Sequence, residues 1–526
     1  MARRFGKPIG ERVIAEDQSE TIAFLASPAA YGAGVDAVER IDTHISVVFL
    51  AGTRAYKLKR AVRYDYVDFS SLELRRTACE AEIRINRRTA PDLYVGVVAV
   101  TRAADGRLAL GGDGPVVDWL VEMVRFDQDG LFDRLAGRGA LTAALMQAVA
   151  DEALALHAAA APRRDKGGRE GMAWVVEGNV AALAAREGAP FDAAKVVRYG
   201  TLAEAALARH AALLDERRRG GLVRLCHGDL HLRNICLIDG HPTLFDAIEF
   251  NDDIACCDVL YDLAFLVMDL LRRDLRPLAN LVLNRYLAIS GDSAGLALFG
   301  FFLSCRAAVR AKTTATSAAA QGEAGEAARL CAEAARYLDD ACAYLTPSPP
   351  RLTAIGGLSG SGKSTLAAAL APALGAPPGA VVLRSDVLRK RLFGVDPCAP
   401  LDAAAYDEEV TNEVYGRIET MAGEALSAGF AVVADAVYAR PEQRARIAAV
   451  AADAGAPFAG LWLDAPAERL AGRLGGRGAD ASDADEAVLE LQLALDVGAV
   501  EWRRIDASGP AEDTRRAAQA ALAGVG

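Results

Sequence analysis

The sequence predicts two folds in one chain: an α+β unit, with a small antiparallel-sheet lobe and a helical lobe, and then an α/β unit with a parallel sheet. Three observations predict this arrangement. Strand-like runs gather before residue 125, helical periodicity dominates 142–345 except near 223–250, and strands alternate with helices after 351. With 526 residues, each unit is long enough to bury its own core.

Composition and charge exclude several classes of protein. Hydrophobic residues make up 52% and charged residues 25%, which is typical of globular domains rather than disordered chains. A formal net charge of -11 opposes general attraction to nucleic acid or to an anionic membrane surface. The nine cysteines form no CxxC pair, and charged residues interrupt the most apolar stretches. We therefore expect a soluble cytoplasmic protein without a nucleic-acid or membrane partner; the sequence does not specify an oligomeric state.

The first unit begins with a predicted hairpin. Strand-like runs at 45–50 and 54–59 flank Ala51-Gly52, which indicates two antiparallel strands. A helix is expected over 72–89. Further strands are expected at 93–101 and 116–124.

A proline-rich segment divides the chain. An Ala-rich helical stretch over about 307–345 runs into Thr346-Pro-Ser-Pro-Pro350, which can neither continue a helix nor donate to a sheet. We therefore place domains at 1–345 and 351–526, joined by a linker at 346–350. In the second domain, apolar runs predict buried parallel strands separated by helices. These strands are expected at 352–355, 381–383, 431–434 and 458–463.

A glycine-rich loop follows the first of these strands. Residues 357–365 read Gly-Leu-Ser-Gly-Ser-Gly-Lys-Ser-Thr, which satisfies G-x-x-x-x-G-K-[ST] between a strand and a helix. Its backbone N–H groups can cradle phosphates, while Lys363 reaches the outer phosphates and Ser364 can ligate Mg²⁺. The sequence thus predicts an ATP–Mg²⁺ site. The residues expected to hold the nucleotide are Gly357, Ser359, Gly360, Ser361, Gly362, Lys363, Ser364 and Thr365.

Carboxylates and arginines complete this predicted site. Asp386 follows the second strand and can accept the proton of an attacking hydroxyl, while Arg389 holds substrate or phosphate; the alternative for Asp386 is a helix N-cap. Asp435 ends an apolar strand, where a carboxylate can reach Mg²⁺, or it is a cap or turn. Arg473 and Arg477 lie four residues apart. They can clamp the transferring phosphate as part of a lid, or form a solvated basic face.

A second cluster of polar residues lies at 227–250. It reads His-Gly-Asp229-Leu-His-Leu-Arg-Asn234, and an Asp-Gly hairpin signal then leads to Asp246. Phosphoryl transfer to a hydroxyl needs a carboxylate that accepts its proton, which we assign to Asp229. It also needs oxygen ligands for Mg²⁺, which we assign to Asn234 and Asp246. His227 is expected to support this loop by hydrogen bonds.

The nucleotide phosphates at this cluster also require a cation. Strand alternation places Lys57 and Lys59 on one face, and we favour Lys57 with Lys59 as the rival. An acidic residue on the following helix should fix this lysine. We prefer Glu82 to Glu80 because the helical spacing turns Glu82 inward. The alternative is an exposed strand with two solvated lysines.

The first unit resembles the aminoglycoside-phosphotransferase and choline-kinase-like branch of the protein-kinase fold. The H-G-D-x-H-x-x-N motif supports this resemblance, and Asp246-x-x-Glu249 fits the metal-binding segment of the branch. The resemblance implies a two-lobe fold, with Glu122 and Met123 at an adenine-binding hinge. The turn at 51–54 lacks G-x-G-x-x-G, so the phosphates must be covered differently. The aromatic-rich insert at 62–69 either lines the cleft or packs, and Asp258 and Asp262 are expected to brace the catalytic loop.

The second unit, about 351–526, resembles small phosphate-loop kinases of the gluconate-kinase-like and zeta-toxin-like kind. This resemblance implies that Asp386 is the base; adenylate-kinase-like specificity stays open. The whole chain resembles fused proteins with both kinds of domain. It is therefore expected to move the ATP γ-phosphate, with Mg²⁺, to hydroxyl groups of a sugar, sugar acid, polyol or aminocyclitol.

Two alternative functions stay open. One domain can be a catalytically silent ATP sensor that regulates the other. The chain can also be an aminoglycoside-modifying resistance enzyme, for which Asp252 and Asp253 are the candidate drug-binding acids.

Overall fold

The computed structural model describes residues 13–64, 66–186, 190–396, 399–475 and 481–524. Their contacts divide the chain into two compact units. The first comprises Met1–Asp269 with Phe301–Leu345, and the second comprises Leu270–Gly300 with Thr346–Gly526. Both predicted fold types are present: an antiparallel sheet with helices in the first unit and a parallel sheet in the second. The domain boundaries at 345 and 351 stay a prediction.

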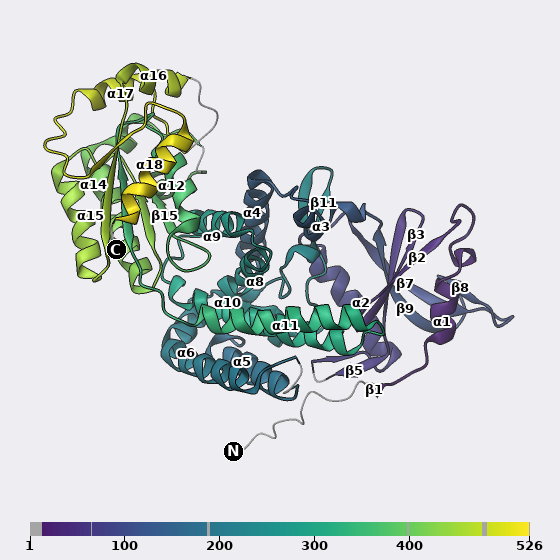
Figure 1. The fold of residues 1–526 in the computed structure, drawn as a ribbon. Coiled ribbons are helices and arrows are strands. Elements are labelled where there is room, and N and C mark those ends of the chain that lie inside the picture. Colours follow the sequence, from purple (N-terminus) through teal and green to yellow (C-terminus); the bar gives the residue numbers. More distant parts are fainter. Residues whose placement is uncertain (1–12, 65, 187–189, 397–398, 476–480, 525–526) are drawn as a thin grey trace. The chain divides into compact units, whose positions relative to one another are not determined.

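The first unit is built on a six-stranded antiparallel sheet (Figure 1). Its strands, in spatial order, are β2 (Val38–Asp42), β3 (Ser46–Ala51), β4 (Arg54–Lys59), β9 (Val116–Val124), β7 (Tyr94–Arg102) and β8 (Leu108–Leu110). Helix α2 (Leu72–Asn86) packs against β7 and β9 and is capped by the Ser71 hydroxyl. Strand alternation gives the sheet two apolar faces: Ala55 and Val121 lie toward α2, while Leu58 and Leu120 lie on the other side.

The predicted hairpin is β3–β4, but an unpredicted strand, β2, precedes it. The loop 43–45 that joins β2 to β3 therefore lies at the end of the hairpin where Ser46 pairs with Lys59. The turn at 51–54 lies at the opposite end. The turn at 51–54 lacks G-x-G-x-x-G, and how the phosphates are covered stays a prediction.

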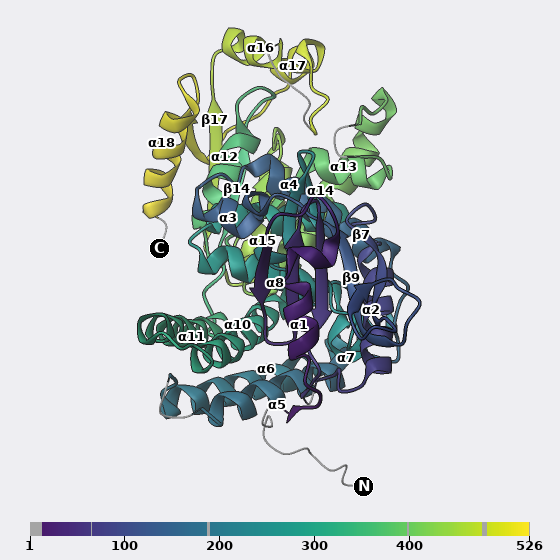
Figure 2. The same cartoon turned by 90° about the vertical axis from the view of Figure 1, so that its right-hand side faces the viewer.

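Helices make up most of the remainder of this unit. They include α4 (Ala143–Ala159), α5 (Gly168–Ala184), α6 (Ala193–Arg219), α8 (Val259–Arg272), α10 (Leu296–Ala319) and α11 (Ala324–Tyr344). Helices α5 and α6 lie side by side in both views (Figures 1 and 2). Between the helices, β11 (Ile235–Ile238) and β12 (His241–Leu244) form the predicted hairpin. Its turn residues, Asp239 and Gly240, both have positive φ, as an Asp-Gly turn requires.

Five short strands complete the described part of the first unit. Strands β5 (Val62–Tyr64) and β6 (Val67–Asp68) pair with each other, and β1 (Val13–Ile14) adds to β5. Strand β10 (Val223–Leu225) pairs with β13 (Cys256–Asp258).

The second unit contains a five-stranded parallel sheet. Its strands, in spatial order, are β15 (Val381–Arg384), β16 (Val432–Asp435), β14 (Leu352–Gly356), β17 (Phe458–Asp464) and β18 (Arg503–Asp506). Helices α12 (Lys363–Leu370) and α18 (Ala511–Ala523) pack on one face through apolar residues such as Leu366 and Leu522. The further helices are α13 (Ser385–Leu392), α14 (Glu408–Ser427), α15 (Pro441–Asp453), α16 (Ala467–Gly475) and α17 (Glu486–Leu493).

Helix α9 (Arg276–Ser290) belongs to the second unit and covers the outer edge of β15. Asn284 accepts a hydrogen bond from Val382 N at 2.7 Å and donates to Ala380 O at 3.1 Å, and Asn280 also donates to Ala380 O. A side-chain amide thus takes the place of a neighbouring strand. No described helix is both long and apolar enough to cross a bilayer.

Candidate active sites

In the first unit, Lys57 and Lys59 converge on one buried carboxylate. Lys57 Nζ lies 2.9 Å from Glu82 Oε1 and 2.5 Å from Asp246 Oδ1, and Lys59 Nζ lies 2.6 Å from Glu82 Oε2. Burial opposes ionisation of Glu82, but the two lysines outweigh it and lower the pKa of Glu82 to about 2. Glu80 is exposed and pairs with Arg76 instead. The geometry therefore favours Lys57 and Glu82 as the pair that reaches Asp246.

Glu249 has a different neighbour from the one expected. It is 5% exposed and pairs with Lys59. The Lys59 ammonium thus joins Glu82 on α2 to Glu249 in the segment that follows Asp246. Glu249 supports the lysine pair, and its place in a metal-binding segment stays a prediction.

The catalytic-loop residues come together as the spacing predicted. Asn234 Nδ2 donates to Asp229 Oδ2 at 2.9 Å, and His231 Nε2 lies 3.2 Å from the same oxygen. Burial opposes ionisation of Asp229, yet His231, His227 and Arg310 hold the pKa of this carboxyl well below its usual range. Asp229 is therefore an ionised acceptor at neutral pH. Asn234 bonds to it through the amide nitrogen.

Asp262 fixes the backbone of this loop by hydrogen bonds. Its carboxylate accepts hydrogen bonds from His227 N at 3.0 Å and Gly228 N at 2.8 Å, and lies 3.0 Å from His157 Nε2. His157, Cys226 and Asp262 have ligand types that could hold a metal ion, but these bonds already use both oxygens of Asp262. The His227 ring bonds Phe245 O, as expected of a supporting residue.

Asp258 does not brace this loop. It forms a two-bond ion pair with the buried Arg217 on α6, with N–O distances of 2.7 and 2.8 Å. Our expectation for Asp258 was therefore wrong.

The two hinge residues face opposite sides of β9. Met123 is buried in the apolar cluster toward α2. The Glu122 carboxylate lies on the other face, 3.6 Å from Arg54 Nε and 3.5 Å from the Tyr56 hydroxyl. The Glu122 side chain therefore cannot contact a nucleotide on the α2 side, and only its main chain can contribute there.

In the second unit, the glycine loop joins β14 to α12 as predicted. Gly357 and Gly360 have φ of 139° and 79°, and a Cβ on Gly360 would lie 2.6 Å from Leu470 O. Only glycine fits there. Lys363 Nζ donates to Leu358 O at 3.0 Å, across the loop. The buried Ser361 hydroxyl has no partner among the described residues, so the loop fits a phosphate ligand.

Two carboxylates lie where the neighbouring strands β16 and β15 end. Asp435 is buried at the end of β16; burial raises its pKa, against the effects of Arg384, Lys363 and Ser364. Its Oδ2 accepts no hydrogen bond among the described residues and lies 3.5 Å from Arg384 Nε, so it already faces a cation. Asp386 lies in the first turn of α13, and it is not the N-cap, because Arg384 occupies that position.

Arg389 makes more contacts with other residues of the chain than expected. It is 5% exposed, its guanidinium lies 4.7 Å from the Tyr406 ring, and it donates to Ala405 O at 2.5 Å and to Thr411 Oγ1 at 3.3 Å. Its buried Nε has no partner in the described part of the chain. The two hydrogen bonds use two of the five N–H donors of the guanidinium, so a role in substrate binding would use the others.

The arginine lid is described only in part. Arg473 on α16 donates to Gly509 O at 2.9 Å, while Arg477 lies outside the described residues. Helices α16 and α17 lie side by side in both views (Figures 1 and 2).

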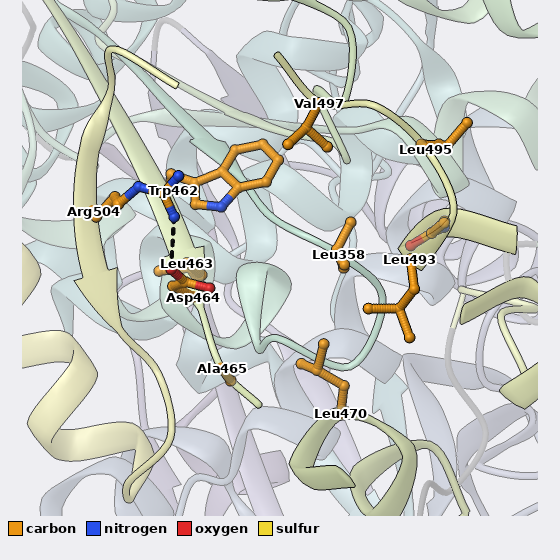
Figure 3. Close-up of a pocket in the computed structure, with 11 residues that line it drawn as sticks. Leu358, Trp462, Leu463, Asp464, Ala465, Leu470, Leu493, Leu495, Val497 and Arg504 are labelled. Atoms are coloured by element: carbon orange, nitrogen blue, oxygen red, sulfur yellow. Dashed lines mark hydrogen bonds and ion pairs between the residues drawn. The ribbon is translucent and has the colours of Figure 1, made fainter. Parts of the chain in front are cut away.

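A cavity of about 170 Å³ lies beside the glycine loop (Figure 3). Its apolar lining includes Leu358, Trp462, Leu463, Leu470, Leu493, Leu495 and Val497. The Asp464–Arg504 ion pair, at 2.7 Å, lies on one side of it. Gln492 on α17 also lines the cavity and accepts a hydrogen bond from Ser359 N at 2.8 Å. Sequence reasoning missed Gln492, because a lone glutamine in a helix carries no motif.

Both units match known families. The model of the phosphotransferase enzyme family matches residues 53–299, and that of an AAA domain matches 352–495. Uncharacterized proteins of Mycobacterium tuberculosis (Rv2004c) and Mycobacterium bovis (Mb2027c) are each 31% identical over 481 residues, or 90% of this chain and 92% of theirs. The chain belongs to one family with these mycobacterial proteins. Its first unit carries a domain of the phosphotransferase enzyme family, and its second carries an AAA domain with a phosphate loop.

Solved structures are similar to one part of the chain each. A gluconokinase from Sinorhizobium meliloti is 24% identical. The match covers 33% of this chain and 92% of the gluconokinase, with a TM-score of 0.24. A sugar kinase from Janibacter is 22% identical over 33% of this chain and 95% of its own, with a TM-score of 0.26. A choline/ethanolamine kinase family protein from Mesorhizobium loti is 14% identical. The match covers 62% of this chain and 98% of the Mesorhizobium protein, with a TM-score of 0.37.

Proposed function

We propose that the chain is a bifunctional ATP-dependent phosphotransferase that moves the γ-phosphate to hydroxyl groups of small molecules. One observation carries this proposal. Each unit places a lysine beside an aspartate, Lys57 by Asp246 and Lys363 by Asp435, and each has a further aspartate, Asp229 or Asp386, suited to accept a proton. A sensor that only binds nucleotide has no use for such a carboxylate.

In the first unit, MgATP would supply the phosphoryl group. Glu82 holds Lys57 where its ammonium can neutralise phosphate oxygens, and Asn234 and Asp246 provide ligand oxygens for Mg²⁺. Asp229 accepts the proton of the acceptor hydroxyl as the new O–P bond forms and the bond between the γ-phosphorus and the leaving ADP breaks.

In the second unit, the glycine loop and Lys363 would hold the phosphates. Ser364 and Asp435 are suited to Mg²⁺, and Asp386 is the base that accepts the hydroxyl proton. Adenylate-kinase-like specificity for a nucleotide acceptor stays open for this unit.

The experiment follows ADP release by the full chain with ATP, Mg²⁺ and panels of sugars, sugar acids and aminoglycosides. Asp229→Asn should abolish one acceptor-dependent activity and Lys363→Ala a different one, because each removes a group of one site only. A pair of variants that both retain every activity would contradict the proposal. If only Lys363→Ala has an effect, the first unit is a sensor or scaffold.

The resistance-enzyme alternative has less support. Its candidate acids are already paired: Asp252 lies 3.2 Å from Arg163, and Asp253 lies 2.6 Å from Lys166. A polycationic drug would have to displace both basic partners. Turnover with aminoglycosides alone would nevertheless favour this alternative.

A further inference from the structure

Four aromatic rings form a continuous row in the first unit. His44 lies 6.4 Å from Tyr64, Tyr64 stacks on Tyr66 at 5.5 Å with planes only 7° apart, and Tyr66 lies 6.3 Å from Phe250. His44 is exposed and the other three are half-buried. We call these four residues the aromatic wall. Its members come from three separate segments of the chain, so the row is a product of the fold.

The rings of the aromatic wall pack on buried residues that fix their positions. Tyr64, Tyr66 and Phe250 pack on a small buried cluster that contains Phe69, whose ring meets Phe250 edge to face at 6.1 Å. Asn251 also donates a hydrogen bond to Tyr66 O at 3.1 Å. These contacts hold the rings in place before any ligand binds, which lowers the entropic cost of binding.

One end of the wall connects to the candidate catalytic residues. Phe250 lies in the segment that also carries Asp246 and Glu249. The same segment is joined to the loop that carries Asp229, because Ile248 N donates to His227 O at 2.9 Å. The wall thus begins beside the candidate metal-binding segment and the loop of the candidate base.

The polar edges of the wall are available. The His44 ring nitrogens and the Tyr64 and Tyr66 hydroxyls have no hydrogen-bond partner among the residues that the structure describes, and these side chains are only partly buried. Stacked rings bind the apolar C–H face of a ring, while the phenol and imidazole edges bond to hydroxyls.

The charges around the wall disfavour a cationic ligand. Asp252 and Asp253 are already paired with basic side chains. The Arg310 guanidinium also interacts with Asp229 and adds positive charge near the base. The remaining acids, Asp229 and Asp246, are assigned to the hydroxyl proton and to Mg²⁺, so an ammonium ligand would have no acid of its own.

Resting on the phosphotransferase activity proposed above, we propose that the aromatic wall binds the acceptor of the first unit, and that this acceptor is an uncharged or anionic polyhydroxylated ring. One ring face stacks on Tyr64 and Tyr66, and a hydroxyl at the ring edge then points to Asp229. The wall distinguishes ring polyols from small amines by stacking area and by charge.

The test uses the full chain with Lys363→Ala, which silences the second unit. Its probes are myo-inositol, D-glucose and D-glucuronate against choline, ethanolamine and kanamycin. Phosphate transfer to at least one of the three ring polyols is expected. Tyr64→Ala and Tyr66→Ala should each raise its KM about tenfold, because each removes roughly 1.4 kcal/mol of apolar contact, and should leave the KM for ATP unchanged.

Tyr31→Ala is the matched control. It removes a ring of the same size from the Tyr31–Tyr56 pair, which packs on the opposite face of the sheet, so the acceptor KM should not change. Tyr66→Phe keeps the stacked ring and should change KM less than Tyr66→Ala.

The outcomes separate the two proposals. Transfer only to the amines, transfer to none of the six probes, or an unchanged KM in both alanine variants overturns the assignment of the wall. If Asp229→Asn leaves transfer intact, the proposed function of the first unit fails instead.

Discussion

Glu82 is a single residue that orders a whole group of charges. It lies fully buried between two lysines, one of which reaches Asp246 and the other Glu249. Removal of one member of a buried ion pair leaves uncompensated charge, which costs about 3–5 kcal/mol. The energetic importance of Glu82 follows from this geometry.

Glu82→Gln should therefore destabilise the contacts between β4 and α2 at neutral pH, and the effect should depend on pH. Because the folded-state pKa is lowered from 4.5 to about 2, the stabilisation is fully present above pH 4.5 and is lost as the pH falls toward 2. Hydrogen exchange of peptides from β4 and α2, followed from pH 7 downward, measures this destabilisation in the variant and in the wild type. The difference from wild type should shrink below pH 4.5.

Glu80→Gln is the control for this prediction. Glu80 lies on the same helix but is exposed, so its pair with Arg76 contributes about 0–1 kcal/mol. Equal effects of the two substitutions at every pH would mean that Glu82 has no special role.

At the scale of elements, the edge of β15 depends on a helix from a distant part of the sequence. Asn284 on α9 satisfies both a backbone donor and a backbone acceptor of this strand. Strand β15 leads directly into α13, which carries Asp386. The α9 contact therefore supports the position of the candidate base.

Asn284→Ala should lower the free energy of unfolding of the second unit by about 1–3 kcal/mol, because it leaves Val382 N and Ala380 O with one partner fewer. Protease susceptibility of β15 and thermal unfolding of the full chain would show it. Thr420→Ala, which removes only an exposed side-chain bond within α14, should have little effect. If the two variants unfold alike, the contact is energetically unimportant.

Strong local patterns made many elements predictable. The β3–β4 hairpin, the Asp-Gly turn and the strands β14, β15, β16 and β17 of the parallel sheet each carry alternation or a continuous apolar run. Strands β2 and β18 were missed, because Val38–Asp42 and Arg503–Asp506 are short, lie at sheet edges and are rich in charged residues. Their strand conformation depends on pairing with a neighbour.

Whole motifs predicted the candidate sites better than single residues did. The spacing in 227–234 and 357–365 placed Asp229, Asn234 and the glycine loop, since each motif is local in sequence. The partners of Glu249 and Arg389 depend on segments far away in the chain, so sequence alone could not supply them.

For the whole molecule, the central claim is that two separate sites each bind a magnesium nucleotide. Family membership supports a kinase-like fold in both units, but it does not show how many of the two sites are active. The proposed function requires each unit to bind its own nucleotide.

Calorimetric titration of the full chain with Mg²⁺ and a non-hydrolysable ATP analogue tests this claim most directly. The wild-type chain should bind two equivalents, Lys57→Gln and Lys363→Ala should each bind one, and the double variant should bind none. A wild-type chain that binds a single equivalent, or single variants that both still bind two, would contradict the account.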